Sequence, residues 1–263
     1  MEAPLDTAAL ARALASARDG GYRLSSTQLQ CPPNLPSAMT VQAKAHEARA
    51  SSVAGWKVAI GPGGRPVAAP LHPLIRDTRP FLSWRPGIAI EVEFAVELGT
   101  DLTCQLGKTY SRIEIEAAVS GIYVGVEIID SRLVEGSNSP FELFLADALA
   151  NGGYVLGPRV PRELLTDNAL ALSVSAGGKP IYVGQAKHPS GDPLAPLVAY
   201  ANEPCDQLGG LKLGQFITTG SLCGVISLQA PTQIDITLNG ALLMQLDMTA
   251  SSEGESEKAL RGW

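Results

Sequence analysis

The chain has 263 residues, 45% of them hydrophobic and 17% charged, and its formal net charge is −6. A chain of this length and composition can form a sizeable core, and we do not expect disorder. Acidic residues outnumber basic ones and no Lys/Arg run occurs, so we expect no nucleic-acid partner. No stretch reaches the roughly 18 apolar residues of a membrane span, so we expect no membrane partner either.

The cysteines and the N-terminus indicate a cellular compartment. The four cysteines lie far apart and form no C-x-x-C pair, which excludes a zinc ribbon or a thioredoxin-type motif. Widely spaced thiols fit a reducing compartment better than a disulfide framework. Residues 1–6 are acidic and lack the basic region that begins a signal peptide. We therefore expect a cytoplasmic protein.

Two helices are predicted near the N-terminus. Residues 7–17 carry a stripe of Leu and Ala, with Asp6 as the expected N-cap and a Gly-Gly pair beyond them. A Pro-rich connection leads to a second predicted helix at residues 38–50, with Ser37 as its expected N-cap.

The rest of the chain favours strands over helices. The strand candidates are residues 55–61, 88–98, 123–130, 171–175, 181–183, 215–219, 224–228 and 234–238. Helices are expected at residues 113–119, 141–150 and 193–202, a loop at 61–73, and an irregular polar tail at 251–263. This mixture predicts an α+β or β-roll architecture. Glycine-rich phosphate fingerprints are missing, so a Rossmann or P-loop fold has no support.

Residues 88–98 form the most informative segment, because apolar residues and glutamates alternate along it. In a strand, Glu91, Glu93 and Glu97 would share one face. Glu91 and Glu93 would then have Cα atoms about 7 Å apart, with no Lys or Arg between them to offset their repulsion. A divalent cation would remove that conflict, since carboxylate oxygens are the ligands that Mg²⁺, Mn²⁺ and Ca²⁺ prefer. A solvated acidic face explains the same pattern and, for this segment alone, is the more common case.

A lone glutamate, Glu127, interrupts the apolar strand candidate at residues 123–130. Burying a carboxylate is unfavourable unless it is paired or ligates a metal. The alternatives are an ion pair with Arg132 or a position at a sheet edge. Together with Glu91 and Glu93, it could supply three oxygen ligands from two strands, which leaves positions for a chelating substrate and water.

An ordered series of short segments resembles a known family. In chain order the segments are Gly55-Trp56-Lys57-Val58, Glu91-Val92-Glu93, the run from Val126 to Arg132, Ala146-Asp147, Asn151, Val155-Leu156-Gly157, Gly191-Asp192-Pro193-Leu194, Ala201-Asn202 and Thr219-Gly220-Ser221-Leu222. The series resembles the 2-keto-4-pentenoate hydratases and the related 4-oxalocrotonate decarboxylases of the fumarylacetoacetate hydrolase superfamily. The similarity runs from about residue 55 to residue 246. The ordered set is more specific for the superfamily than for one reaction.

The resemblance implies an α+β fold, a fumarylacetoacetate-hydrolase-like mixed β-roll with a small N-terminal helical region. We expect residues 1–80 to form an N-terminal helical and strand region, and residues 81–263 to form the β-roll catalytic domain. The resemblance further implies a homo-oligomer and a Mg²⁺ or Mn²⁺ ion held by Glu91, Glu93 and Glu127. The substrate would be a small 2-oxo or 2-enol carboxylic acid, which offers two neighbouring oxygens for chelation.

The resemblance also implies roles outside the acidic set. Lys57 would be the catalytic residue: burial would lower its pKa toward a range useful for proton transfer, whereas a charged Lys57 would stabilise an enolate. Gly220 and Ser221 match a Gly-Ser pair whose hydroxyl holds the substrate carboxylate. His72 lies in a segment that matches a pocket loop, and Arg132 is a further candidate for substrate contact. From the residues alone, Lys57 could equally be a surface lysine and Ser221 a turn residue.

Two further expectations concern the surroundings of the site. Asp130 and Arg132 are expected to form a salt bridge that supports the metal ligands. His46 is expected on a helix surface, since the three histidines show no ligand spacing.

Departures from the family bear on the reaction. Residues 70–74 contain no acidic residue, which many hydratases have there, and the loop at 61–69 is shorter. The His-Glu dyad of C–C hydrolases is not recognisable. The leading hypothesis is a hydratase of 2-hydroxy-2,4-dienoates in aromatic catabolism, followed by a 2-oxo diacid decarboxylase. An acylpyruvate C–C hydrolase and a non-catalytic partner subunit rank third and fourth.

Overall fold

A computed structural model describes residues 4–50, 52–104 and 107–250. The tail predicted at residues 251–263 lies outside this described part. Two β-sheets and a few short helices make up the described chain, which confirms the predicted α+β class.

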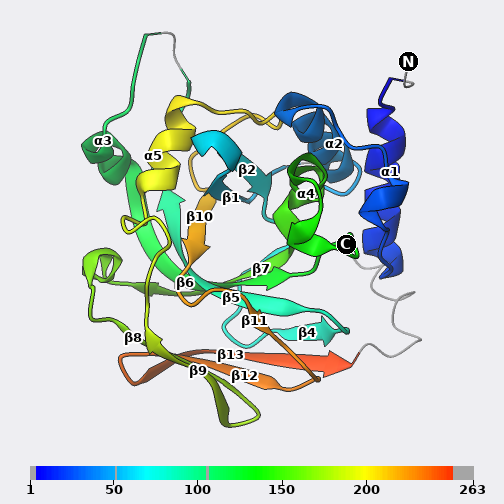
Figure 1. Ribbon diagram of the computed structural model, residues 1–263. Coiled ribbons are helices and arrows are strands. Elements are labelled where there is room, and N and C mark those ends of the chain that lie inside the picture. Colours follow the sequence, from blue (N-terminus) through cyan, green and yellow to red (C-terminus); the bar gives the residue numbers. More distant parts are fainter. Residues whose placement is uncertain (1–3, 51, 105–106, 251–263) are drawn as a thin grey trace.

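The helices are short and gather in two groups. Those described are α1 (Thr7–Gly20), α2 (Leu35–Glu47), α3 (Arg112–Ala118), α4 (Phe141–Ala146) and α5 (Ala195–Asn202). Short 3₁₀ turns lie at Ser26–Gln28, Pro62–Gly64, Gly136–Asn138, Ala148–Ala150 and Arg162–Thr166. Figure 1 shows α1, α2 and α4 together at one side and α3 and α5 at the other. No helix in the described ranges has both the length and the apolar character needed to cross a membrane.

The ends of the first two helices follow local capping chemistry. Asp6 caps α1 as predicted, because its carboxylate accepts hydrogen bonds from the backbone N–H groups of Ala8 and Ala9. For α2 the predicted cap was wrong: Asn34 is the N-cap, and its side chain accepts from the N–H of Ser37. The helix can begin before Pro36 because the backbone N–H groups of the first turn have no intrahelical acceptor, so the N–H that proline lacks costs no hydrogen bond there.

The larger sheet has eight strands and contains the predicted glutamate strands. Its order is β2-β1-β10-β5-β6-β7-β3, and β11 pairs with β5. The strands are β1 (Gly55–Ile60), β2 (Pro66–Pro70), β3 (Leu74–Ile75), β5 (Ala89–Leu98), β6 (Val119–Ile129), β7 (Asn151–Val160), β10 (Phe216–Ser221) and β11 (Ile226–Ser227). The five-stranded sheet, in the order β4-β13-β12-β8-β9, lies below it in Figure 1. Its strands are β4 (Phe81–Trp84), β8 (Ala171–Ala176), β9 (Lys179–Gln185), β12 (Gln233–Leu238) and β13 (Ala241–Ala250).

Several strands lie where the sequence predicted none, namely β2, β3, β4, β7 and β13. β7 contains Gly152, Gly153 and Gly157, residues that favour turns when read locally. Pairing with β6 and the burial of Val155 and Leu156 outweigh that preference. β2 begins with a proline, and it lies at the edge of its sheet, where a missing N–H donor is tolerated.

The large sheet crosses the boundary expected at residue 80. β1, β2 and β3 precede this position, yet they belong to the same sheet as β5, β6 and β7. The division at residue 80 stays a prediction, and it does not coincide with a break in the sheet.

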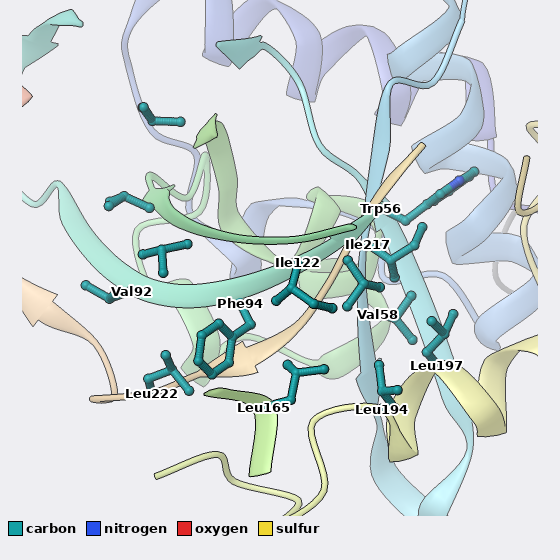
Figure 2. Packing of buried hydrophobic residues seen from close by; sticks show 14 of the residues in the cluster. Trp56, Val58, Val92, Phe94, Ile122, Leu165, Leu194, Leu197, Ile217 and Leu222 are labelled. Atoms are coloured by element: carbon teal, nitrogen blue, oxygen red, sulfur yellow. The ribbon is translucent and has the colours of Figure 1, made fainter. Parts of the chain in front are cut away.

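Apolar clusters hold the helices and sheets together. The main cluster packs one face of the large sheet against α5 and against the five-stranded sheet; Figure 2 shows Phe94, Ile122 and Ile217 near Leu194 and Leu197. The second cluster joins α1, α2 and α4 through residues including Leu10, Leu14, Met39, Leu143 and Leu145. At roughly 1.5–3 kcal/mol for each fully buried large side chain, this contact fixes the N-terminal helices against the body of the protein.

Candidate metal centre

Three glutamates from neighbouring strands meet at one point of the large sheet. In the antiparallel register, Glu91 of β5 faces Glu127 of β6, and Glu93 follows two residues along β5. One carboxylate oxygen of each lies within 4.8 Å of the others. Glu93 and Glu127 are fully buried, and Glu91 is half-buried. The expectation that these three acids converge is therefore met.

The environment of Glu93 fits a divalent cation. Its Oε2 accepts a hydrogen bond from the hydroxyl of Thr218, whereas its Oε1 is buried without a hydrogen-bond partner among the described residues. Burial and the nearby Glu127 raise the pKa of Glu93 well above its usual value. An ionised carboxylate with a free buried oxygen needs a cation, and Mg²⁺ and Mn²⁺ prefer such oxygens.

Lys57 completes the charge balance of the cluster. Its Nζ lies 2.8 Å from Glu127 Oε2 and 3.4 Å from Glu91 Oε2. With all groups ionised, three carboxylates and one ammonium carry two net negative charges, which matches a divalent ion. Burial alone lowers the pKa of Lys57, but Glu127, Glu91 and Glu93 together raise it above the ordinary lysine value. Of the two alternatives for Lys57, a lowered pKa and a retained charge, the structure favours the second, because the carboxylates outweigh desolvation and keep the lysine charged.

Residues not predicted for the site hold the carboxylates in place. Asn151, at the start of β7, donates a hydrogen bond from Nδ2 to Glu127 Oε1 at 3.0 Å. Tyr154 fills the space above Gly125, where a Cβ atom would overlap its hydroxyl. Gly125 is the cross-strand partner of Glu93, so a glycine there lets the aromatic ring approach the cluster. Asn151 belongs to the ordered series, but its contact with Glu127 was not predicted. Thr218 and Tyr154 gave no signal in the sequence, because only the pairing of β10 with β5 and of β7 with β6 brings them near.

The predicted salt bridge between Asp130 and Arg132 is wrong. The guanidinium of Arg132 pairs with the buried carboxylate of Asp147 and donates from Nη1 to the backbone oxygens of Asp130 and Asn151. The carboxylate of Asp130 instead pairs with Arg85. The reason is that Asp130 and Arg132 follow the end of β6, where the chain turns and points their side chains in different directions. Arg132 is only 3% exposed, and its proposed contact with substrate stays a prediction.

Gly220 and Ser221 lie on β10, beside the cluster. Ser221 is the cross-strand partner of Glu93, and its Oγ donates to the backbone oxygen of Gly224. Gly220 lies against the ring of His188. Their predicted role in holding a substrate carboxylate stays a prediction.

His72 lies apart from the acidic cluster. It lines a separate small hollow between α1, α2 and the sheet, together with Arg18, His46 and Arg49. Burial and the nearby Arg18 lower the pKa of His72 to about 4, so the ring is neutral near pH 7. A contact between His72 and substrate stays a prediction. His46 is 6% exposed and packs edge-on against His72, so its expected surface position is wrong.

A cleft of about 340 Å³ opens onto the cluster. Lys57 and Glu91 line it, together with apolar side chains that include Phe144 and Leu149. The cleft therefore combines a charged end, which can hold a metal chelate, with apolar walls that suit a carbon chain.

Comparisons with known proteins agree with this description. No protein-family model matches the chain. A 2-keto-4-pentenoate hydratase from Paraburkholderia xenovorans and 2-keto-4-pentenoate hydratase 3 from Pseudomonas putida are each 28% identical to it over 153 residues. Each match covers 57% of this chain and 55% of the relative. The matched part therefore spans about half the length of these relatives.

Solved structures show the fold. A 4-oxalocrotonate decarboxylase from Pseudomonas putida G7, complexed with magnesium and adipate, superposes with a TM-score of 0.73 at 18% identity and covers 94% of this chain and 100% of its own. A putative fumarylacetoacetate hydrolase family protein from Yersinia pestis has a TM-score of 0.51 at 20% identity and covers 74% of this chain and 91% of its own. The chain therefore has the fold of the fumarylacetoacetate hydrolase superfamily and, in sequence and structure, is similar to 2-keto-4-pentenoate hydratases and 4-oxalocrotonate decarboxylases.

Proposed function

We propose that this protein is a Mg²⁺- or Mn²⁺-dependent hydro-lyase that hydrates 2-hydroxy-2,4-dienoates to 4-hydroxy-2-oxo acids, as in aromatic catabolism. The observation that carries the proposal is the buried set of Glu91, Glu93 and Glu127, with a free Glu93 oxygen and a charged Lys57 beside it. The names of the similar hydratases support the reaction. A cytoplasmic homo-oligomer is part of the same proposal.

The side chains of the cleft have distinct tasks in this reaction. A bound divalent ion would supply Lewis-acid polarisation of the 2-oxygen and so favour the enolate form of the substrate. Glu91, Glu93 and Glu127 would hold that ion, and Asn151 and Thr218 fix the orientation of two of these carboxylates.

Lys57 and the cleft walls would act on the substrate itself. The positive charge of Lys57 would stabilise the negative charge that develops on the substrate oxygens. The apolar walls would limit water around the carbon chain and strengthen these charge interactions.

Decarboxylation of a 2-oxo diacid is the second candidate, because the cleft offers little for activating water. Apart from Glu91, the carboxyl group that lines it is Glu135. Hydrogen bonds from the backbone N–H of Ser26 and the hydroxyl of Ser25 lower the pKa of Glu135 to about 2. Such a carboxylate is a weak general base. Decarboxylation needs the same enolate stabilisation but no activated water.

A metal-supplemented substrate screen tests the proposal. The purified protein would be assayed with Mg²⁺ or Mn²⁺ against 2-hydroxy-2,4-dienoates, 4-oxalocrotonate and acylpyruvates. We expect turnover of a dienoate that EDTA abolishes and excess Mg²⁺ restores. Turnover of the oxo diacid alone would replace hydration by decarboxylation. Turnover that persists unchanged in EDTA, or none with any substrate, would remove the metal-dependent lyase assignment.

A further inference from the structure

A small hollow lies between α1, α2 and the large sheet. Its volume is about 40 Å³, and the charged residues of the described chain that line it are Arg18, Arg49, Arg132 and Asp147. The described residues that line this hollow and those that line the glutamate cleft share no member. Since one water occupies about 10–15 Å³ of such volume, the hollow has room for about three oxygen-sized atoms.

The lining of this hollow carries more positive than negative charge. Arg132 pairs with the buried carboxylate of Asp147, and Arg49 pairs with Asp19, which does not line the hollow. Arg18 forms no ion pair with any carboxylate in the part of the chain that the structure describes. Three guanidinium groups and two carboxylates therefore leave one net positive charge.

Acids outside the hollow do not supply the missing negative charge. Asp130 and Glu47 act on the lining groups from outside it. The carboxylate of Asp130 is already paired with Arg85. Glu47 is exposed on α2, where solvent and salt screen its charge.

The immediate partners of Arg18 do not offset its charge either. Its guanidinium donates to the backbone oxygens of Asn151 and His72, which are neutral acceptors and use only two of its five N–H groups. Burial, followed by the nearby Arg132 and Arg49, lowers the pKa of Arg18 to about 9. An anion among these groups would favour the charged form of Arg18, and the hollow would attract it.

Two buried polar atoms of the lining have no hydrogen-bond partner among the described residues, Nε of Arg49 and Oε1 of Gln42. Nε of Arg49 can only donate, whereas Oε1 of Gln42 can only accept. The amide of Gln42 cannot turn to exchange these roles, because its Nε2 donates to the backbone oxygen of Leu145. Buried polar atoms are usually paired, so these two predict a ligand that accepts at one atom and donates at another.

We propose that this hollow binds a small monoanionic oxyanion that carries an O–H group, with hydrogencarbonate as the member that fits its volume. The negative charge of this ligand offsets the charge of Arg18. Two of its oxygens accept charge-assisted hydrogen bonds from Arg18 and from Nε of Arg49, and its O–H donates to Oε1 of Gln42. The site is separate from the glutamate cluster and does not depend on the proposed lyase activity.

Two matched anions test this assignment. Nitrate, like hydrogencarbonate, is a planar monoanion with three oxygens, but it has no O–H group. Each would be titrated by calorimetry at pH 8 and constant ionic strength, with EDTA present so that hydrogencarbonate cannot bind a metal ion at the glutamate cluster. The proteins are the wild type, Arg18→Met and Arg49→Met. Arg12→Met is the control, since Arg12 is an exposed arginine on α1 that does not line the hollow.

We expect the wild type to bind hydrogencarbonate at least about tenfold more tightly than nitrate, the usual effect of one hydrogen bond to a charged group. Arg18→Met and Arg49→Met should each weaken hydrogencarbonate binding by at least about tenfold, and Arg12→Met should leave it unchanged. If Arg18→Met does not fold, Arg49→Met alone decides the outcome. Wild-type affinity in a folded variant of either arginine, equal affinity for the two anions, or no saturable binding to the wild type would overturn the assignment.

Discussion

The Nζ atom of Lys57 lies 2.8 Å from Oε2 of Glu127, although β10 and β5 separate their strands in the sheet. The lysine therefore reaches across two strands to a fully buried carboxylate. Its charge offsets one of the three acids, and the remaining two negative charges match a divalent ion. This pairing links the catalytic candidate to the metal ligands, and it determines what substitutions at each should do.

Glu93→Gln should remove divalent-ion binding while preserving the fold. The amide keeps the shape of the side chain and can still contact Thr218, but it lacks the charge that a cation needs. Loss of an outer partner of a metal ligand already weakens binding by 10–100-fold, so we expect a loss of at least about 100-fold in Mg²⁺ affinity by calorimetry. Glu97→Gln is the control, since Glu97 lies on the same strand outside the cluster. Unchanged Mg²⁺ affinity in Glu93→Gln would contradict the metal centre.

Stability of the metal-free protein should fall as pH rises from about 5 to 8. Burial raises the pKa values of Glu93 and Glu127 in the folded state. The folded protein then holds protons that the unfolded chain has released, so stability decreases with pH, by at most about 1.4 kcal/mol per pH unit for each group. Lys57, whose pKa is raised, loses its contribution only above pH 10 and does not affect this range.

Urea unfolding in EDTA at several pH values measures this effect. The difference in stability between the wild type and Glu93→Gln isolates the titration of Glu93 from that of other groups. Excess Mg²⁺ competes with protons for the carboxylates, so its stabilising effect should grow with pH. A pH-independent difference between the two proteins would show that Glu93 is not protonated in the metal-free state.

Lys57→Met should separate metal binding from chemistry. Removing an ammonium within 4 Å of Glu127 and Glu91 removes a competing cation, so Mg²⁺ affinity should stay the same or increase. The kcat should fall by about 10²–10³-fold, the usual contribution of one positioned group that stabilises negative charge in the transition state. Calorimetry with Mg²⁺ and steady-state kinetics at saturating Mg²⁺ measure the two quantities. A variant with wild-type kcat would exclude Lys57 from proton transfer and from charge stabilisation.

Arg132→Met should destabilise the fold strongly. It leaves the buried carboxylate of Asp147 without its cation, and such changes cost about 3–5 kcal/mol. Arg112→Met is the matched control, because Arg112 pairs with the more exposed Asp192 and Glu116 and should cost only about 0–1 kcal/mol. Urea unfolding at pH 7 checks both values. If Arg132→Met loses no more stability than the control, the buried pair does not stabilise the fold.

The glutamate strands were predictable because strand periodicity acts locally. The alternation at residues 88–98 placed Glu91 and Glu93 on one face, and the lone Glu127 in an apolar run marked a special position. The first helix was also predictable, since Asp6 and the Gly-Gly pair act within one turn of its ends. The order of the short motifs then indicated the superfamily, which the similar proteins support.

Features that depend on partners distant in sequence were not predictable. The glycines of β7 favour a turn when its sequence is read locally, and only pairing with β6 makes it a strand. Asn151 contacts Glu127 because of the same pairing. The predicted Asp130–Arg132 bridge failed for the same reason, since the closer partner of Arg132 is Asp147.

The amino-acid sequence alone determined which residues carry charge, which segments alternate, and therefore that acids would gather on a strand face. The tertiary structure alone decided which carboxylate oxygens lie close together, that Lys57 stays charged among them, and which side chains line the cleft beside them. The physical reason is the distance along the chain over which each interaction acts. Side-chain alternation and capping act over a few residues, whereas burial, ion pairing and pKa depend on strands that meet only after the chain has folded.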